Sequence, residues 1–524
     1  MNMCLTSSVK RAAQINPEGL AIAGPGAVSW KAFAKRVNCV AGGLGALGVR
    51  PGNRVALLSL NRPEFLEAQY AIWAAGAVLV PINHRLAVSE IVDILRDAEV
   101  SCLAVDEDHA SIALEVTESV ESLRSLIALQ VPEALQATAS VSVASLAQLR
   151  ATDPASVEQR APNSDETTAA IFYTGGTTGR PKGVMLSHRS FAVQALVMAN
   201  ALQFQSDSVY LHATPMFHLA DFGIGLALTV AAGAHAFLPR FGAVQAVERI
   251  AEVGVTEVNL VPTMLAAMLD QLSVSQASVL MNIRTVAYGG SSIAAPLLQR
   301  LMQVMPNARF RQFYGMTELC GGCTTLPPER HVVDGRLAGK LRSAGQALPM
   351  MEVAIKSVDG ALLENGEVGE IVVRGAPVMQ GYWRNAAATE AVLRDGWLHT
   401  GDVGSIDDDG FLTIIDRIKD MIVTGGENVY SVEVESTLAS HPDVAACAVI
   451  GLPDPKWGER VHAVIVKRPN TDLSESDLDE HCRARIAGYK RPRSYEIRED
   501  GLPLSGAGKI RKAQLREEAL RKPN

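Results

Sequence analysis

The chain has 524 residues, of which 48% are hydrophobic and 20% charged, and its formal net charge is −8. This length predicts at least two domains, and the composition is that of an ordinary globular protein. The acidic balance gives no broad basic surface, so we expect no nucleic-acid partner and no stable membrane insertion. Seven scattered cysteines favour free thiols in a reducing compartment, and therefore a cytoplasmic location.

The first 160 residues alternate between helical and strand-like segments. A helix is predicted from Asn61-Arg62-Pro63 to Ala75, because proline suits the first helical turn. A buried strand follows at Gly76–Ile82, Ser89 is expected to cap the next helix, and Ser101–Val105 is expected to be another strand. Such alternation is typical of parallel sheets covered by helices, and so predicts an α/β fold for this part of the chain.

The segment Tyr173–His188 is the most informative stretch of the sequence. Apolar runs at Ala169–Phe172 and Val184–Leu186 predict strands on either side of a glycine- and threonine-rich loop. Glycines let backbone N–H groups approach an anion closely, and Lys182 adds positive charge. The spacing differs from the P-loop of nucleoside triphosphatases, which needs a glycine, four residues and then Gly-Lys-Ser/Thr. An unliganded surface loop is the alternative, but turn chemistry alone rarely gives so long a pattern.

This loop closely resembles the signature loop of the adenylate-forming superfamily, which includes acyl- and aryl-CoA synthetases, luciferases and peptide-synthetase adenylation domains. Gly176 stands where the family usually has serine, which leaves the backbone donors in place. The resemblance implies a catalytic Lys182 and an ATP-binding set made up of Thr174, Gly175, Gly176, Thr177, Thr178 and Gly179.

The heptad Gln312–Glu318 lies at about the family's interval from that loop. An aromatic side chain can stack on a base, a threonine can donate to a phosphate, and a glutamate can hold Mg²⁺ between phosphates. By resemblance, Tyr314 packs on adenine beside Gly315, Thr317 contacts the α-phosphate, and Glu318 is the magnesium ligand. Taken alone, the heptad would be equally compatible with a turn and a solvated glutamate.

Two further segments resemble parts of the nucleotide site. Tyr288–Ser292 is similar to the segment that lines the adenine and acyl pockets, which assigns Gly289, Gly290 and Ser291. Asp395–Asp402 resembles the ribose motif, in which an ionised carboxylate such as Asp402 accepts hydrogen bonds from vicinal hydroxyls. By itself this would be a turn aspartate; Arg417, fifteen residues on, favours the ribose interpretation.

The segment Asp416–Asp420 matches the superfamily's hinge, with Lys419 as the residue whose backbone rotates. Short, turn-separated strands precede it from about residue 350, as in a small β-subdomain. A compact α+β unit follows, with a helix capped by Ser431. We therefore expect an adenylation domain at residues 1–416, a hinge at 417–419 and a mobile domain at 420–524. The alternative for the hinge segment is an exposed run of charges.

The mobile domain would carry two functional segments. Thr424–Asn428 is similar to the segment beside the pantetheine tunnel of CoA-forming relatives, which assigns Gly425, Gly426 and Glu427 to CoA binding. Leu504–Lys512 resembles the loop that carries the adenylation lysine, here Lys509, whose ammonium can neutralise charge in the transition state.

The acyl pocket is expected next to Pro215–Phe222. Amino-acid-activating relatives have an aspartate after the phenylalanine, and here His218 takes that position, although Asp221 could substitute for it. By resemblance, the pocket residues are His218, Phe222, Val261, Gly290, Gly315 and Met316. Phe222–Leu238, the longest apolar stretch, is too short for a membrane span and is expected to form a buried helix. We expect a fatty or aryl-substituted acid.

The resemblance as a whole implies an α/β N-terminal domain and a small α+β C-terminal domain that rotates about a hinge. It implies ATP, Mg²⁺ and coenzyme A, an acyl adenylate formed with release of pyrophosphate, and an acyl-CoA thioester formed with release of AMP. Two alternatives stay open, namely acyl transfer to a separate carrier protein and a catalytically silent paralogue that binds nucleotide or acyl groups. Homo-oligomer formation is also open.

Overall fold

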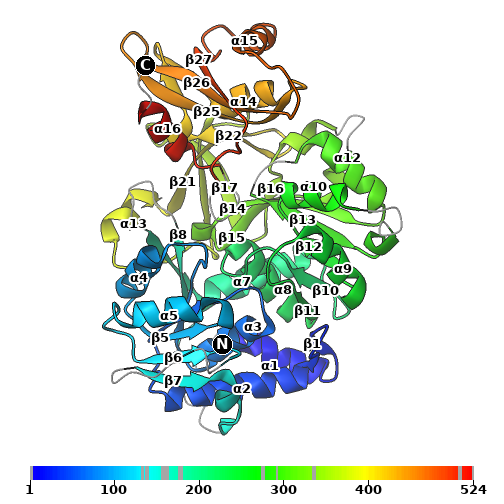
Figure 1. Ribbon diagram of the computed structural model, residues 1–524, viewed down its shortest axis with the longest axis vertical. Helices are drawn as coiled ribbons and strands as arrows, with labels where there is room; N and C mark the ends of the chain where they lie inside the picture. Colours follow the sequence, from blue (N-terminus) through cyan, green and yellow to red (C-terminus); the bar gives the residue numbers. More distant parts are fainter. Residues whose placement is uncertain are drawn as a thin grey trace. The chain divides into compact units, whose positions relative to one another are not determined.

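The computed structural model describes residues 4–131, 135, 141–154, 164–174, 181–272, 278–290, 293–332, 338–504 and 510–521. Figure 1 traces them from blue at the N-terminus to red at the C-terminus. The chain forms two compact units, one of Met1–Val353 with Val373–Leu398 and one of Ala354–Val372 with His399–Asn524. This division does not locate a hinge, so the domain boundaries at residues 416 and 420 stay predictions.

The first unit contains an eight-stranded sheet that is parallel over most of its width. Its strand order is β19-β9-β8-β4-β3-β5-β6-β7, and only β9 and β19 run antiparallel to their neighbours. The strands are β3 (Arg54–Leu58), β4 (Val78–Pro81), β5 (Val100–Val105), β6 (Ser125–Ala128), β7 (Ser142–Ser145), β8 (Thr168–Thr174), β9 (Lys182–Ser187) and β19 (Gly381–Tyr382).

A second sheet of the first unit has nine strands in the order β16-β15-β14-β13-β12-β10-β11-β1-β2. Strands β14, β13, β12, β10 and β11 are parallel neighbours. The strands are β1 (Leu20–Ile22), β2 (Val28–Ser29), β10 (Val209–His212), β11 (Ala234–Phe237), β12 (Glu257–Asn259), β13 (Thr285–Gly289), β14 (Arg309–Met316), β15 (Gly321–Leu326) and β16 (Gln346–Ala347). The predicted parallel sheets are therefore confirmed.

Helices accompany these sheets, as Figure 1 shows, and three of them carry an aromatic cluster. Trp73 of α3, Phe191 of α7 and Phe222 of α8 pack on one another and on Phe172 of β8, with ring centroids 5.1–6.2 Å apart. Large buried rings contribute strongly to the stability of a core. The helices are α1 (Thr6–Ile15), α2 (Trp30–Ala46), α3 (Pro63–Ala74), α4 (Val88–Asp97), α5 (Ala110–Thr117), α6 (Leu146–Arg150), α7 (His188–Leu202), α8 (Leu219–Ala231), α9 (Ala243–Val253), α10 (Pro262–Asp270), α12 (Ala295–Val304) and α13 (Ala386–Val392).

Three predicted elements were wrong in detail. The expected helix over Phe222–Leu238 is helix α8 up to Ala231 followed by strand β11, and the break falls at Ala232, which has a left-handed φ of 58°. Buried helices and buried strands are equally apolar, so composition did not separate them. Ser89 lies inside α4, whose N-cap is Ala87. Ser431 is the first residue of its helix and not the cap, and its hydroxyl donates to Asp416 instead.

The predicted β-subdomain is a five-stranded sheet with the order β17-β18-β21-β20, in which β22 pairs with β21. Asp395 and Gly396, with φ of 51° and 77°, make the two-residue turn between β20 and β21. Asp-Gly is the preferred sequence for such a turn, because both residues tolerate positive φ. The strands are β17 (Met351–Lys356), β18 (Gly369–Gly375), β20 (Leu393–Arg394), β21 (Trp397–Ile406) and β22 (Leu412–Arg417).

The C-terminal part of the chain forms the expected α+β unit around a second five-stranded sheet. Its order is β24-β23-β26-β25, with β27 parallel to β26. Its core is aliphatic and includes Val434, Leu438, Ile465 and Leu478. The elements are β23 (Ile422–Thr424), β24 (Glu427–Val429), α14 (Ser431–Ala439), β25 (Val444–Asp454), β26 (Gly458–Lys467), α15 (Glu475–Arg483), β27 (Ser494–Arg498) and α16 (Lys512–Arg521).

Truncating the aromatic cluster should destabilise the first unit. Trp73→Ala removes a fully buried indole whose Nε1–H donates to the Ala169 carbonyl, so we expect a loss of about 3–5 kcal/mol in the free energy of unfolding. Urea denaturation followed by circular dichroism measures this loss, with Leu196→Ala, at an exposed position on α7, as control. Equal urea midpoints of unfolding for Trp73→Ala and Leu196→Ala would contradict the prediction.

Candidate active site

Several predicted site residues lie at one edge of the nine-stranded sheet. Gly289 ends β13 and Gly290 follows it, while Gly315 and Met316 end β14. Val261 follows β12 and His218 follows β10, each at the start of a helix. These four strands are neighbours and run parallel, so their carboxyl ends meet at a single edge, where open α/β sheets bind ligands.

Glycine at two of these positions permits close backbone packing. A Cβ on Gly315 would lie 1.8 Å from the Gly321 carbonyl oxygen, and one on Gly289 would lie 2.6 Å from the Phe313 oxygen. Neither backbone can move away without breaking strand pairing. The steric limit accounts for the glycines whether or not a ligand binds there.

Tyr382, a residue that the sequence analysis did not identify, contacts both Glu318 and Lys182. The Tyr382 hydroxyl donates to Oε1 of Glu318 over 2.9 Å, and Nζ of Lys182 lies 5.0 Å from the centre of the Tyr382 ring. The Met379 N–H donates to the Glu318 carbonyl over 2.9 Å. Burial, and then the Glu318 carboxylate, raise the pKa of Tyr382, so its hydroxyl stays a donor. Two of the predicted catalytic residues, Lys182 and Glu318, thus contact Tyr382, and Thr317 precedes Glu318 in the same short helical turn.

Thr174 and Lys182 face each other at the ends of β8 and β9. They are paired across the antiparallel ladder, and the Thr174 hydroxyl donates to the Lys182 carbonyl over 3.5 Å. This pairing brings together the two ends of the glycine-rich loop. Some of the predicted site residues lie outside the described residues. They are the loop residues Gly175, Gly176, Thr177, Thr178 and Gly179, together with Ser291 and Lys509.

In the second unit, Asp402 and Arg417, the two residues of the ribose prediction, form an ion pair. They are opposite each other on β21 and β22, with Nε of Arg417 3.2 Å from Oδ1 of Asp402. The Asp402 side chain is nearly buried, while that of Arg417 is half exposed. Glu370 fixes the approach to Asp402, because its carboxylate bonds to Nδ1 of His399 at 2.6 Å and accepts from the Gly401 N–H at 3.2 Å.

The predicted hinge follows β22 directly. Lys419 lies exposed in a single helical turn, Ile418–Asp420. Asp416 just before it is buried and accepts from the Arg417 N–H and from both the N–H and the hydroxyl of Ser431. These bonds hold Asp416 in place, whereas the side chain of Lys419 is exposed.

Two of the predicted CoA residues, Gly425 and Gly426, form the turn between β23 and β24, and the third, Glu427, begins β24. Gly425 and Gly426 have φ of 61° and 84°, and they are exposed, as is Glu427. A Cβ on Gly425 would lie 2.8 Å from Cε3 of Trp457, whereas one on Gly426 would meet nothing within 4 Å. Trp457 therefore covers one side of this turn, which the sequence analysis did not foresee.

Two residues of the predicted acyl segment are fully buried. Phe222 is 2% exposed, and its ring packs in the aromatic cluster described above. Asp221 is 0% exposed and accepts from Tyr210 at 2.8 Å and Thr214 at 3.0 Å, while His212 lies at 2.5 Å. Its carboxylate is thus engaged within the protein, which argues against the alternative that Asp221 holds a substrate ammonium.

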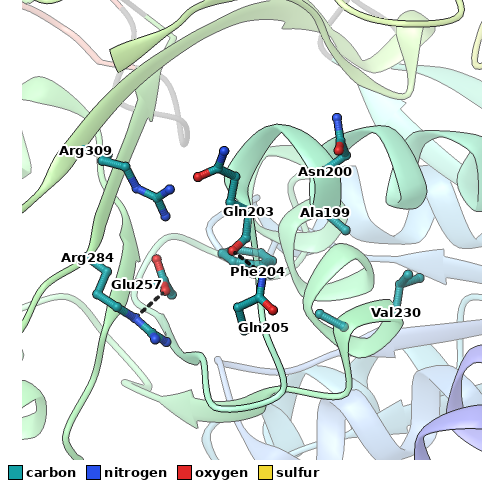
Figure 2. A pocket seen from close by; sticks show the side chains of 10 residues that line it. Ala199, Asn200, Gln203, Phe204, Gln205, Val230, Glu257, Arg284 and Arg309 are labelled. Atoms are coloured by element: carbon teal, nitrogen blue, oxygen red, sulfur yellow. Dashed lines mark hydrogen bonds and ion pairs between the residues drawn. The ribbon is translucent and has the colours of Figure 1, made fainter. Parts of the chain in front are cut away.

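A cavity of about 560 Å³ lies at the opposite edge of the same sheet, as Figure 2 shows. Glu257 begins β12, Arg284 precedes β13 and Arg309 begins β14, so the cavity is at the amino ends of these strands. An ion pair of 3.2 Å between Arg284 and Glu257 spans part of its wall. The predicted catalytic residues are at the carboxyl ends, and this cavity is a separate feature.

Two features are absent from the part of the chain that the structure describes. No group of three or more metal-ligating side chains comes together in that part of the chain. None of the described helices combines the length and the apolar character that a membrane crossing needs.

Comparison with known proteins covers nearly the whole chain. The sequence models of two families match, AMP-binding enzyme over residues 9–383 and AMP-binding enzyme C-terminal domain over residues 433–509. A feruloyl-CoA synthase of Amycolatopsis sp is 38% identical over 98% of this chain and 99% of its own. The fatty acid–[acyl-carrier-protein] ligase ScoC of Streptomyces coeruleorubidus is 34% identical over 94% and 91%. The structure of ATP-bound MatB from Rhodopseudomonas palustris superimposes with a TM-score of 0.87, at 28% identity and 99% coverage of both chains.

Removing the Tyr382 hydroxyl should weaken the Glu318 site. Tyr382→Phe keeps the ring beside Lys182 but loses a hydrogen bond to a carboxylate, an interaction that contributes about 1.5–3 kcal/mol. We expect acid-dependent ATP–pyrophosphate exchange to fall by about tenfold or more, with a raised Mg²⁺ requirement. Tyr489→Phe, at an exposed tyrosine, is the control. An exchange rate equal to that of the unmodified protein would refute the role of Tyr382.

Proposed function

Because the chain belongs to the AMP-binding enzyme family, we propose that it is an ATP-dependent carboxylic acid–CoA ligase that forms an acyl adenylate and then an acyl-CoA. The observation that carries the proposal is the group of Lys182, Tyr382 and Glu318, together with Thr317, near the carboxyl ends of the parallel strands. These are the residue types that an adenylation site needs for phosphate, for a cation and for orientation.

In the first step, a carboxylate oxygen of the acid attacks the α-phosphorus of ATP and pyrophosphate leaves. The bond from the α-phosphorus to the bridging oxygen breaks as the bond between the carboxylate oxygen and the α-phosphorus forms, which gives a mixed anhydride. Lys182 and Lys509 would neutralise charge on the phosphates, and Thr317 would donate to an α-phosphate oxygen. Such catalysis is positioning and electrostatic stabilisation, with little covalent work for the protein.

Glu318 fits the role of a magnesium ligand. Its carboxylate is buried, Oε1 accepts from Tyr382, and among the described residues none donates to Oε2. Mg²⁺ is commonly held by one or two carboxylates together with substrate phosphates and waters, so a single glutamate suffices. When bound, the ion would neutralise charge on the leaving pyrophosphate. The Tyr382 hydroxyl would keep the Glu318 carboxylate oriented toward it.

In the second step, the CoA thiol attacks the acyl carbon, the acyl–oxygen bond breaks, and AMP leaves. Asp402 and Arg417 would hold the ribose, and Lys419 would be the hinge about which residues 420–524 turn. That motion would replace Lys509 by the face that carries Gly425, Gly426 and Glu427. Rotation at one or two exposed residues is physically reasonable, because only a few backbone angles need to change.

The substrate is proposed to be an aryl-substituted or fatty acid. His218 is half-buried where amino-acid-activating relatives have aspartate, and Asp221 is already engaged with its own neighbours. The site would therefore lack a carboxylate for a substrate ammonium. Among the relatives compared above, one is named for a feruloyl substrate and another for fatty acids.

Transfer to a carrier protein is the second candidate. One relative, 34% identical to this chain, is named as a ligase of fatty acids to acyl carrier protein. Such an enzyme would use the same first step. In the second step, the carrier protein would supply the same kind of phosphopantetheine thiol that CoA supplies. Replacing CoA by a phosphopantetheinyl carrier protein in the assay distinguishes the two acceptors.

The direct test is pyrophosphate release with Mg-ATP over a panel of hydroxycinnamic, benzoic and aliphatic acids, with and without CoA. Sustained CoA-dependent turnover with at least one acid is the expected result, and the preferred acid names the substrate class. Lys509→Ala should abolish release with every acid, because the ammonium that stabilises the transition state is gone. Failure of all acids in the unmodified protein would instead support a silent paralogue.

The glycine turn allows the two steps to be separated. Asparagine tolerates positive φ, so Gly426→Asn should keep the turn and place an amide where the thiol approaches. We expect pyrophosphate release in a single turnover to be unchanged and thioester formation to fall at least about tenfold. Gly360→Asn is a matched control, since Gly360 also has positive φ and open space around it. Equal loss of both steps in Gly426→Asn would contradict the assignment.

A further inference from the structure

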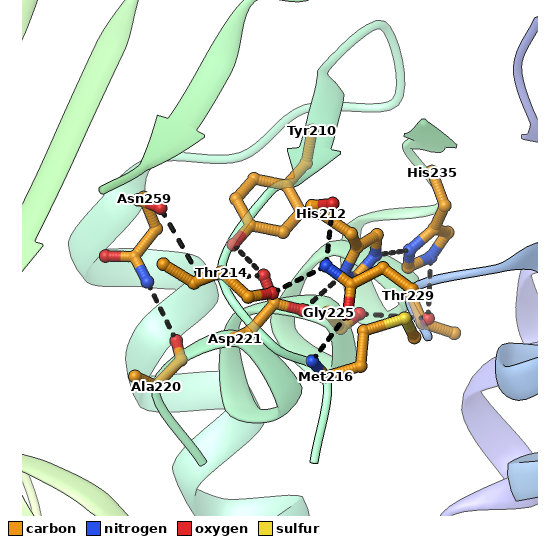
Figure 3. A network of polar contacts seen from close by, with 11 residues as sticks. Tyr210, His212, Thr214, Met216, Ala220, Asp221, Gly225, Thr229, His235 and Asn259 are labelled. Atoms are coloured by element: carbon orange, nitrogen blue, oxygen red, sulfur yellow. Dashed lines mark hydrogen bonds and ion pairs between the residues drawn. The ribbon is translucent and has the colours of Figure 1, made fainter. Parts of the chain in front are cut away.

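A chain of buried polar side chains runs behind the predicted acyl segment, from Asp221 to Thr229 (Figure 3). Oδ2 of Asp221 lies 2.5 Å from Nδ1 of His212, and Nε2 of His212 lies 2.9 Å from Nδ1 of His235. Nε2 of His235 lies 3.1 Å from the Thr229 hydroxyl, which donates to the Gly225 carbonyl over 3.1 Å. All four side chains are at most 1% exposed, so water does not complete these contacts.

The hydrogens that link these side chains, from Asp221 to the Gly225 carbonyl, can be counted. Its two ends, an ionised carboxylate and a backbone carbonyl, only accept hydrogen bonds. The four links therefore need four hydrogens. Two neutral imidazoles and one hydroxyl supply three. Every link is satisfied when one imidazole carries an extra proton.

The extra proton belongs on His212 for electrostatic reasons. Asp221 is fully buried, and among the described residues His212 is the only basic side chain that forms an ion pair with it. A buried carboxylate is costly unless it is paired and hydrogen-bonded. Burial, and then the neighbouring His212, hold the pKa of His235 well below its usual value, so His235 is the neutral member. Two titratable phenols also face this row of side chains, Tyr70 next to Thr229 and Tyr210 next to Asp221. Burial raises the pKa of both, so both stay neutral.

The same carboxylate also holds the loop between β10 and α8. Oδ1 of Asp221 accepts from Tyr210 on β10 and from Thr214 in the loop. Asn61 ties the loop from the other side, because its amide donates to the Thr214 carbonyl over 2.8 Å and accepts from the Met216 N–H over 2.9 Å. This loop ends at His218, the N-cap of α8.

We propose that Asp221 and His212 form a buried carboxylate–imidazolium pair that positions the loop of residues 213–218, and through it the bound acid. The positioning of the bound acid rests on the acid–CoA ligase function, whereas the charged state of the pair and its hold on the loop do not. Asp221 and His212 are positioning residues, since they touch the loop and not the reacting atoms. The pair fixes where the acid carboxylate meets the α-phosphorus, and a small displacement there changes the rate.

The charge state is tested by nitrogen NMR of protein labelled with ¹⁵N-histidine, with His212 assigned by its loss in His212→Gln. We expect His212 to show two protonated ring nitrogens at neutral pH and His235 to show one. Thr229→Val removes the hydroxyl with little change in shape, and with it two of the four links. The two remaining links need two hydrogens, which two neutral imidazoles supply, so we expect His212 to become neutral. Thr229→Ser keeps the hydroxyl and the imidazolium. A neutral His212 in the unmodified protein would overturn the proposal, whatever the enzyme's activity.

The positioning role is tested by kinetics on the preferred acid. In Asp221→Asn we expect kcat/KM for the acid to fall at least about tenfold, while KM for ATP stays within about twofold. Thr229→Val should also lower kcat/KM for the acid and leave KM for ATP nearly unchanged. Thr229→Ser should leave kcat/KM for the acid unchanged. Glu67→Gln removes a buried carboxylate that pairs with Arg150, and should lower thermal stability without changing KM for the acid. Equal losses for acid and ATP in Asp221→Asn would contradict positioning.

Discussion

The hydrogen bond from Tyr382 to Glu318 joins the two sheets of the first unit, and the predicted adenylation site depends on it. Tyr382 lies on β19 of the eight-stranded sheet, and Glu318 follows β14 of the nine-stranded sheet. Lys182 reaches the same tyrosine from β9. The side chains proposed to bind phosphate and a cation, Lys182 and Glu318, thus come from different sheets and meet around one ring.

Much of this arrangement could be predicted from the sequence, because its motifs combine local patterns with chemistry. Proline at the start of α3, the alternation of strands and helices, and the Asp-Gly turn at residues 395–396 each follow from backbone preference. The positions of Gly289 and Gly315 at neighbouring strand ends follow from the parallel sheet. The glycine-rich loop and Lys509 remain predictions, since they lie outside the described residues.

Other features could not be predicted, because they depend on contacts between distant segments. Tyr382 lies 64 residues from Glu318, and nothing near it in the sequence marks it as a partner. Asp221 resembles a substrate ligand in the sequence, and only burial among Tyr210, His212 and Thr214 shows that it holds the loop. Phe222 was expected to line the acyl pocket, and its ring packs in the aromatic core.

The central claim is that the acid's own oxygen attacks the α-phosphorus of ATP, and isotope transfer tests it directly. The preferred acid is labelled with ¹⁸O in both carboxylate oxygens, and one turnover with Mg-ATP and CoA is analysed by mass spectrometry. The mechanism predicts one ¹⁸O atom in AMP, one in the acyl-CoA and none in pyrophosphate. Unlabelled AMP, or label in pyrophosphate or phosphate, would contradict formation of an acyl adenylate.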